Sequence, residues 1–147
     1  MPKILIVEDD LMTADMAEEV LVEHGYDVCG IARTVAEAIA LARRHRPDLV
    51  ILDQRLADGG LGTEVAVDLD LPGGPGILYA SGNVSHIMTN AGSGHACLAK
   101  PYTSADLVRS LEIVAELLAT GKATPPFPHG LKLLPPASAA PKRLSYA

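Results

Sequence analysis

The segment Lys3-Ile4-Leu5-Ile6-Val7-Glu8-Asp9-Asp10 decides the fold of this chain of 147 residues. Its uninterrupted apolar run is typical of a strand that helices cover on both faces, and three acidic residues follow the run directly. Residues 11–24 then place apolar side chains, Met16 and Leu21 among them, at helical spacing, and Gly25 ends that helix. The segment therefore predicts the first unit of a repeating strand–helix fold.

The same alternation recurs as far as residue 120. Strands are expected over 3–7, 26–32, 49–52, 76–80 and 95–99. Helices are expected over 11–24, from Thr34 to Pro47, over 61–69 and 84–91, and from Thr103 to Gly121. Five such units predict an α/β fold, a doubly wound five-stranded parallel sheet with helices on both faces. A closed eight-unit barrel would need about twice the chain length.

The composition argues against several functional classes. Aromatic residues make up only 3% of the chain, so the base stacking that single-stranded nucleic-acid binders use is not expected. A formal net charge of −6 argues against a duplex-binding surface. No apolar run approaches the roughly 20 residues that cross a bilayer, and the N-terminus lacks a signal-peptide layout. Two cysteines, Cys29 and Cys97, are too few for a disulfide framework, so we expect a cytoplasmic protein. From the composition and charge together, we expect that it binds neither nucleic acid nor membrane.

Residues 121–147 differ from residues 1–120. All 18 acidic side chains lie in residues 1–120, whereas residues 121–147 carry four basic side chains and six of the 11 prolines. We therefore expect one domain over 1–120, a Pro-rich basic tail over 121–147 and no output domain. Composition favours a disordered tail. Its apolar side chains could instead fold back on the acidic body, cross to a second copy in a homodimer, or dock a partner.

Polar side chains stand where the predicted strands end. Glu8 and Asp9 follow the first strand, Asp53 the third, Ser81 the fourth and Lys100 the fifth. Because parallel strands share one carboxyl edge, we expect these side chains to converge there. Clustered carboxylates repel one another unless a cation lies among them, and Mg²⁺ is the divalent cation that oxygen ligands of this kind suit.

A carboxylate near Mg²⁺ that faces an ammonium and a hydroxyl is arranged to accept a phosphoryl group. Each of these residues alone has a simpler interpretation. Glu8 and Asp9 could be exposed acids that stabilise the N-terminus of the following helix through its dipole. Asp53 could simply cap the end of a strand, and Ser81 or Lys100 could belong to a turn or loop. Only the whole set indicates phosphoryl chemistry.

In the order and placement of these residues, the chain resembles the receiver domains of bacterial two-component response regulators over residues 3–119. The resemblance implies a flavodoxin-like sheet in the order 2-1-3-4-5. It implies that a histidine kinase or histidine phosphotransfer protein phosphorylates Asp53, and that the domain signals to a downstream protein target or acts as a phosphate shuttle or sink. The implied roles are Mg²⁺ binding by Asp9, Asp53 and the Arg55 backbone carbonyl, with Glu8 acting through water, and phosphoryl contacts from Ser81 and Lys100.

The segment Tyr79-Ala80-Ser81-Gly82-Asn83 resembles the signature of the FATGUY subfamily of single-domain regulators, although Asn83 replaces its final aromatic residue. Receivers usually carry an aromatic switch residue three positions before the lysine, where this chain has Cys97. Arg55 and Asn83 would flank the path of an attacking water. Arg55 could form a salt bridge across the site or obstruct that path.

Two other functions remain open from the sequence. The missing switch aromatic and the unusual tail would also suit a receiver-like interaction module that works without phosphorylation. A phosphatase of the aspartyl-phosphate type usually has an acid two residues after the nucleophile, where this chain has Arg55. We therefore expect a signalling phosphoprotein rather than an enzyme that turns over a substrate.

Overall fold

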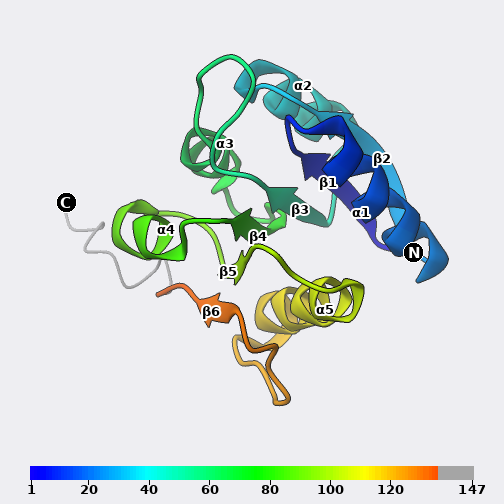
Figure 1. Cartoon of the computed structure of the whole chain (residues 1–147), viewed down its shortest axis with the longest axis vertical. Coiled ribbons are helices and arrows are strands. Elements are labelled where there is room, and N and C mark those ends of the chain that lie inside the picture. The colour runs from blue at the N-terminus through cyan, green and yellow to red at the C-terminus, as the bar shows by residue number, and fades with distance from the viewer. Residues whose placement is uncertain (136–147) are drawn as a thin grey trace.

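The computed structural model describes residues 1–135, in which six strands form one sheet and five helices cover it (Figure 1). The strands are β1 (Lys3–Val7), β2 (Asp27–Ala32), β3 (Leu49–Leu52), β4 (Gly76–Ser81), β5 (Ala96–Ala99) and β6 (Leu131–Leu133). The helices are α1 (Leu11–Glu23), α2 (Val35–His45), α3 (Gly62–Leu69), α4 (Val84–Asn90) and α5 (Ser104–Thr120). These bounds agree with the expected strands and helices to within a few residues.

The sheet order is β2-β1-β3-β4-β5-β6. The first five strands are parallel and doubly wound, which confirms the predicted α/β fold and its strand order. The sheet nevertheless has a sixth strand that the sequence did not predict, because β6 pairs antiparallel with β5. No helix of residues 1–135 is long and apolar enough to cross a bilayer.

The helices lie in two layers. One hydrophobic cluster joins α1 and α5 to one face of the sheet through residues such as Leu21 and Leu111. The other cluster joins α2, α3 and α4 to the opposite face through residues such as Val65 and Ile87. Because both faces of the central strands are covered, β1 and β3 are continuous apolar runs. Aliphatic side chains predominate in both clusters.

Local capping fixes the ends of two helices as the sequence indicates. The Thr34 hydroxyl accepts a hydrogen bond from the Glu37 amide, and the Thr103 hydroxyl accepts one from the Asp106 amide. Gly121 ends α5 in the left-handed conformation, with φ of 79°. The face of α1 differs from the expectation, since Ala14 is buried and Met16 is 65% exposed.

The chain after α5 packs back on the domain. We call residues 122–135 the strap. It contains β6, and its Leu131 and Leu134 are both buried. Of the alternatives for the tail, the described part therefore folds back on its own chain, while the remainder of the tail, residues 136–147, lies outside the described residues.

Candidate functional site

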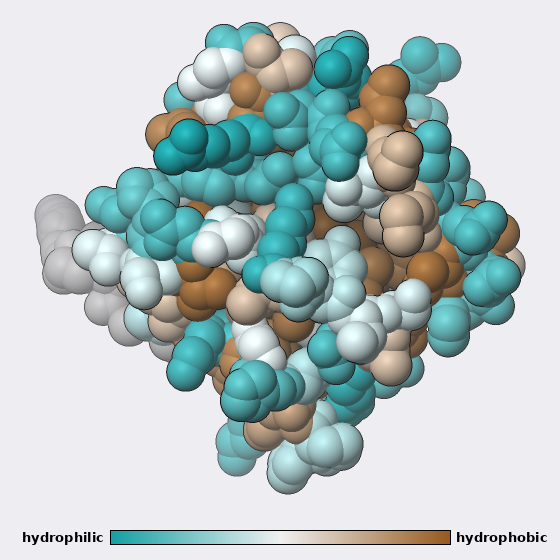
Figure 2. Space-filling view, in the orientation of Figure 1, coloured by the Kyte–Doolittle hydropathy of each residue, from teal (hydrophilic) through white to brown (hydrophobic). Residues whose placement is uncertain are grey.

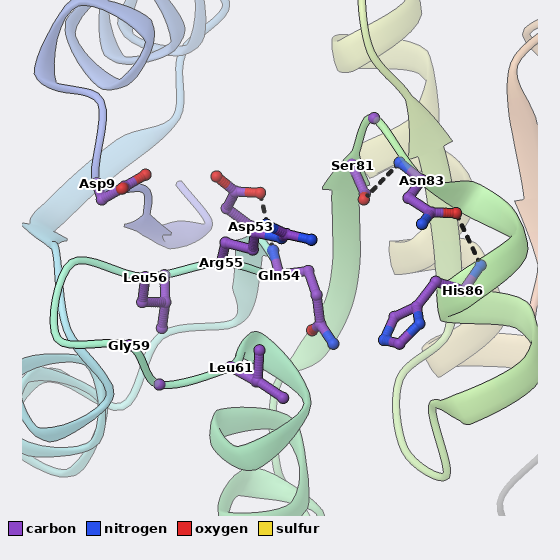
Figure 3. Close-up of a pocket in the computed structure, with 12 residues that line it drawn as sticks. Asp9, Asp53, Gln54, Arg55, Leu56, Gly59, Leu61, Ser81, Asn83 and His86 are labelled. Atoms are coloured by element: carbon purple, nitrogen blue, oxygen red, sulfur yellow. Dashed lines mark hydrogen bonds between the residues drawn. The ribbon is translucent and has the colours of Figure 1, made fainter.

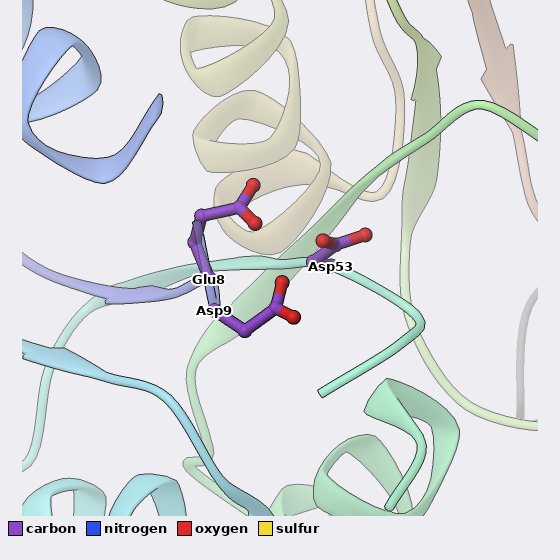
Figure 4. A group of neighbouring side chains, drawn as sticks. All are labelled: Glu8, Asp9 and Asp53. Carbon is purple, nitrogen blue, oxygen red and sulfur yellow. The ribbon is translucent and has the colours of Figure 1, made fainter. Parts of the chain in front are cut away.

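Three carboxylates meet at the carboxyl edge of the sheet. Glu8 and Asp9 follow β1, and Asp53 follows β3, the neighbouring parallel strand in register with it. One carboxylate oxygen from each of the three lies within 4.8 Å of the others (Figure 4). Glu8 is buried, whereas Asp9 and Asp53 are half-buried and open to the pocket. The structure thus brings together the acidic residues that the sequence singled out.

Lys100 supplies the one cation paired with this cluster among residues 1–135. Its Nζ lies 2.8 Å from Oε1 of Glu8 and 3.5 Å from Oδ2 of Asp53. The Lys100 amide donates to the Ser81 carbonyl, which fixes the end of β5 against the end of β4. The peptide bond between Lys100 and Pro101 is cis.

The charges of the site perturb one another. Burial raises the pKa of Glu8, and the nearby Asp53 raises it further, while the hydrogen bond from Lys100 opposes both. Burial alone would lower the pKa of Lys100, but the bond to Glu8 and the charge of Asp53 raise it overall. The pair thus favours the ammonium form of Lys100, while burial makes the Glu8 carboxyl harder to ionise.

The donor set fits a hard divalent cation. Glu8, Asp9 and Asp53 offer only oxygen ligands, and Mg²⁺ binds proteins through one or two carboxylates while it keeps several waters. The half-buried Asp9 and Asp53 leave room for those waters in the adjoining pocket. Without a metal ion, the single ammonium of Lys100 faces two of these carboxylates.

A pocket of about 760 Å³ opens beside Asp53, and Ser81 lies across it (Figure 3). Oδ1 of Asp53 accepts a hydrogen bond of 2.8 Å from the Gln54 amide, and Oδ2 faces Lys100. The Ser81 hydroxyl accepts a hydrogen bond of 3.0 Å from the Asn83 amide. Asp53 and Ser81 therefore line one pocket in which a phosphoryl group could be held, and Lys100, outside the lining of that pocket, reaches Oδ2 of Asp53.

The loop after β3 is shaped by close backbone contacts. The Gly62 amide donates to the Gln54 carbonyl over 2.7 Å, and the Gln54 side chain accepts from the Thr63 amide. A Cβ atom at position 62 would clash with the Asp53 carbonyl, so only glycine fits there. Gln54 and Gly62 support Asp53, and sequence reasoning passed over both because nothing in the local pattern marks them.

Two residues on the rim, Asp10 and Arg55, stay outside the acidic cluster and its ion pairs. Asp10 does not join the cluster, because its side chain accepts from the Thr13 hydroxyl in the first turn of α1, and this hydrogen bond lowers the pKa of Asp10. Arg55 is exposed and belongs to none of the ion pairs of residues 1–135, so the salt bridge considered above is absent there. In Figure 3 its side chain points toward the β4 side of the pocket.

A buried aromatic ring lies next to the expected switch position. Cys97 on β5 pairs directly with Tyr79 on β4, and both side chains are completely buried. The Tyr79 hydroxyl donates to the Ser93 carbonyl, which satisfies it inside the core. Burial raises the pKa of both residues, that of Cys97 to about 11. The assignment to the FATGUY subfamily remains a prediction.

The chain matches known proteins over this same region. Residues 4–112 match the response regulator receiver domain. The transcriptional regulatory protein PdtaR of Mycobacterium tuberculosis is 34% identical over 115 residues, which cover 76% of this chain and 55% of PdtaR. The phyllosphere-induced regulator PhyR of Methylorubrum extorquens is 45% identical over 69 residues, which are 46% of this chain and 26% of PhyR. The chain thus spans about half the length of PdtaR and less of PhyR.

The fold agrees with these sequence matches. A crystal structure of a CheY-like response regulator receiver domain protein from Methanospirillum hungatei superposes with a TM-score of 0.71 at 26% identity. The superposition covers 82% of this chain and 98% of that one. With three carboxylates, a hydroxyl and an ammonium at the carboxyl edge of a doubly wound sheet, the chain belongs to the family of response regulator receiver domains.

Proposed function

We propose that the protein is a phosphoacceptor signalling protein in which Asp53 receives a phosphoryl group from a phosphohistidine. The observation that carries the proposal is the position of the Asp53 carboxylate, which lies within 4.8 Å of oxygens of Glu8 and Asp9 and 3.5 Å from the ammonium of Lys100. A carboxylate in this position can attack phosphorus while Lys100, and Mg²⁺ if it is bound by the acidic residues, would balance the charge on the phosphoryl oxygens.

Each residue of the site has a distinct role in the proposed phosphoryl transfer. An oxygen of Asp53 attacks phosphorus, the phosphorus–nitrogen bond of the phosphohistidine breaks, and the released imidazole takes up a proton. Asp9, Asp53 and the Arg55 carbonyl would hold Mg²⁺, which would neutralise phosphoryl charge, and Glu8 would bind one of its waters. Lys100 would leave Glu8 for a phosphoryl oxygen, and the Ser81 hydroxyl would donate to another.

The phosphoryl donor is proposed to be a histidine kinase or histidine phosphotransfer protein that docks beside Lys100. A groove of about 590 Å³ between α1 and α5 begins at Lys100 and Pro101 and is lined by Met16 and Val20. Apolar side chains reach the surface between these two helices in Figure 2. An exposed apolar patch next to a reactive carboxylate suits a protein donor better than a small phosphomonoester.

The phosphorylated domain would then act on a downstream protein target or pass the phosphoryl group on. We propose no turnover of an external substrate beyond self-catalysed transfer to Asp53 and its hydrolysis. Arg55, exposed and directed across the pocket, would hinder the water that hydrolyses the acyl phosphate.

Acetyl phosphate tests the proposal. With acetyl phosphate and Mg²⁺, the intact mass of the protein should rise by one phosphoryl group of about 80 Da, and Asp53→Asn should abolish the rise. A matched control is Asp58→Asn, which changes an exposed acid of the same loop. An adduct that persists in Asp53→Asn, or no adduct at any Mg²⁺ concentration, would reject the proposal.

One observation favours a second candidate, an interaction module that works without phosphorylation. Cys97 occupies the place of the usual switch aromatic, and the strap already covers β5. This function predicts partner binding that Asp53→Asn leaves unchanged. Loss of partner binding in that variant would exclude it.

A further inference from the structure

The strap is attached to β5 by its backbone. At one end of β6, the Ala99 amide donates to the Gly130 carbonyl over 3.0 Å. At the other end, the Leu134 amide donates to the His95 carbonyl over 3.0 Å. The strap thus occupies the whole outer edge of β5, which would otherwise expose unpaired backbone groups.

Two leucines of the strap enter opposite layers of the core. Leu131 joins the cluster under α1 and α5, and Leu134 joins the cluster under α2, α3 and α4. A Cβ atom on Gly94 would lie 2.6 Å from the Tyr79 ring and 3.2 Å from Leu134, so Gly94 leaves space in which that ring and Leu134 meet. Leu131 and Leu134 are therefore specific anchors of the strap.

The preceding part of the strap is held by α5. The Arg109 guanidinium donates to the carbonyls of Thr124 and Pro126, and the Glu116 carboxylate accepts from the amide and hydroxyl of Thr124. These bonds lie at the surface, and Phe127, the only Phe of the chain, remains 44% exposed. This part of the strap is therefore attached without a core of its own.

Both ends of β6 lie next to residues of the phosphoacceptor site. Gly130 is bonded to Ala99, which directly precedes Lys100. Leu134 approaches the ring of Tyr79, which lies two residues before Ser81 on β4. In the present arrangement Lys100 is bonded to Glu8, and the Ser81 hydroxyl accepts from Asn83. For both residues to contact a phosphoryl group, the ammonium of Lys100 must move toward that group and the Ser81 hydroxyl must turn its O–H toward it, which it can do while still accepting from Asn83.

From these contacts we propose that the strap is a removable strand, bound to β5 when Asp53 is unmodified and released when Asp53 carries a phosphoryl group. The inference rests on the proposed function of Asp53. The strap fits Lys100 and Ser81 in their present positions, so movement of the two strand ends weakens the bond at Gly130 and the packing of Leu134. Phosphorylation and strap binding therefore oppose each other, and the opposition is reciprocal.

The released edge is a docking site for a partner of defined chemistry. It accepts an extended segment that runs antiparallel to β5 and carries leucine-sized side chains three residues apart, as Leu131 and Leu134 do. Backbone bonds would supply affinity, and the two apolar slots would supply specificity. We propose a partner protein that adds such a strand in place of the strap.

Amide exchange of the full chain tests the release. After treatment with acetyl phosphate and Mg²⁺, the Leu134 and Ala99 amides should exchange about tenfold faster or more, and Asp53→Asn should show no change. Intact mass of the same sample separates the two hypotheses. An adduct without faster exchange would overturn the strap proposal alone, whereas absence of an adduct would overturn both proposals.

A reversible lock tests the reciprocal effect. Position 132 lies directly opposite Cys97 in the ladder, so Lys132→Cys can form a disulfide that holds the strap in place. The oxidised variant should accumulate the acyl phosphate several-fold less than the same protein after reduction, while the wild type should not respond to the oxidant. Equal accumulation in the oxidised and reduced variant would contradict the coupling.

The docking site has its own probe, a fluorescent peptide with the sequence of residues 125–135. The peptide should bind the phosphorylated full chain and should not bind the unmodified or locked protein. A control peptide with alanine at the positions of Leu131 and Leu134 should not bind either form. Binding of both peptides alike, or of neither to the phosphorylated chain, would overturn the proposed docking site.

Discussion

The ammonium of Lys100 lies 2.8 Å from the carboxylate of Glu8, a residue 92 positions earlier in the chain. The pair joins the ends of β5 and β1 across the site, and Asp53, which follows β3, lies 3.5 Å from the same ammonium. Lys100 therefore forms ion pairs with two carboxylates when no other cation is present. A phosphoryl group or a divalent cation at Asp53 would change this balance.

Removal of the ammonium should destabilise the metal-free protein. We expect Lys100→Met to lower the free energy of unfolding by about 1–3 kcal/mol, because it leaves the buried Glu8 carboxylate without its partner. Mg²⁺ should recover part of this loss by binding the folded form. Urea unfolding with and without Mg²⁺ measures both effects. Equal stability of variant and wild type without metal would contradict this role of Lys100.

A methyl group at position 62 should displace the backbone of Asp53 and so disturb the site. In Gly62→Ala the new Cβ would collide with the Asp53 carbonyl, so we expect a loss of roughly 1–3 kcal/mol in the free energy of unfolding. Mg²⁺ affinity should fall as well, because the loop that carries Asp53 must move. Gly82→Ala is the matched control, since a Cβ there meets nothing within 4 Å. Similar Mg²⁺ titrations for the two variants would refute the prediction.

Stability should depend on pH through His95. Its Nδ1 accepts a hydrogen bond from the Ile77 amide, and burial lowers the pKa of the ring, although Asp70 opposes the shift. The unfolded chain therefore binds a proton more readily than the folded protein does. His95 therefore contributes fully to the free energy of unfolding above its pKa in the unfolded chain, about 6.5. This contribution is lost as the pH falls through the lower pKa of the folded protein.

His95→Asn should remove this part of the pH dependence, because an asparagine oxygen can accept the Ile77 bond without titrating. Urea unfolding at about pH 7.5 and about pH 5.5 gives the comparison. An unchanged difference between the two pH values in the variant would assign the dependence to other groups.

The bonds between α5 and the strap can be weakened selectively. Arg109→Lys should lose at least one of the two carbonyl contacts, so exchange of amides in residues 122–135 should increase while the rest of the domain stays protected. The expected cost is about 1 kcal/mol of strap stability. Arg43→Lys, at an exposed ion pair with Asp68, is the matched control. Equal exchange in the two variants would show that Arg109 does not hold the strap.

Much of the domain and its site could be predicted from the sequence, since buried parallel strands leave a strong signal. The apolar runs of β1 and β3 end at the acidic residues, and parallel pairing alone brings Glu8 and Asp53 to one edge. Parallel pairing likewise brings Lys100, after β5, and Ser81, at the end of β4, to that edge. Which partner each side chain takes could not be predicted, because this depends on packing across the sheet.

The strap shows where sequence reasoning fails. Its proline content and lack of acids resemble a disordered segment, and a strand of three residues has no periodicity of its own. It is ordered because the edge of β5 and two slots for Leu131 and Leu134 already exist in the folded domain. The pairing of Tyr79 with Cys97 could not be predicted for a similar reason, because strand register sets it.

The central claim is that Asp53 is the residue that accepts the phosphoryl group, and chemical mapping of the modified residue tests it most directly. Borohydride converts an aspartyl phosphate to homoserine, which tandem mass spectrometry of the digested protein locates in the chain. After treatment with acetyl phosphate and Mg²⁺, homoserine should be found at position 53 and not at Asp9 or Asp58. Homoserine at another acid, or its absence at 53 from a sample whose intact mass has risen, would contradict the account.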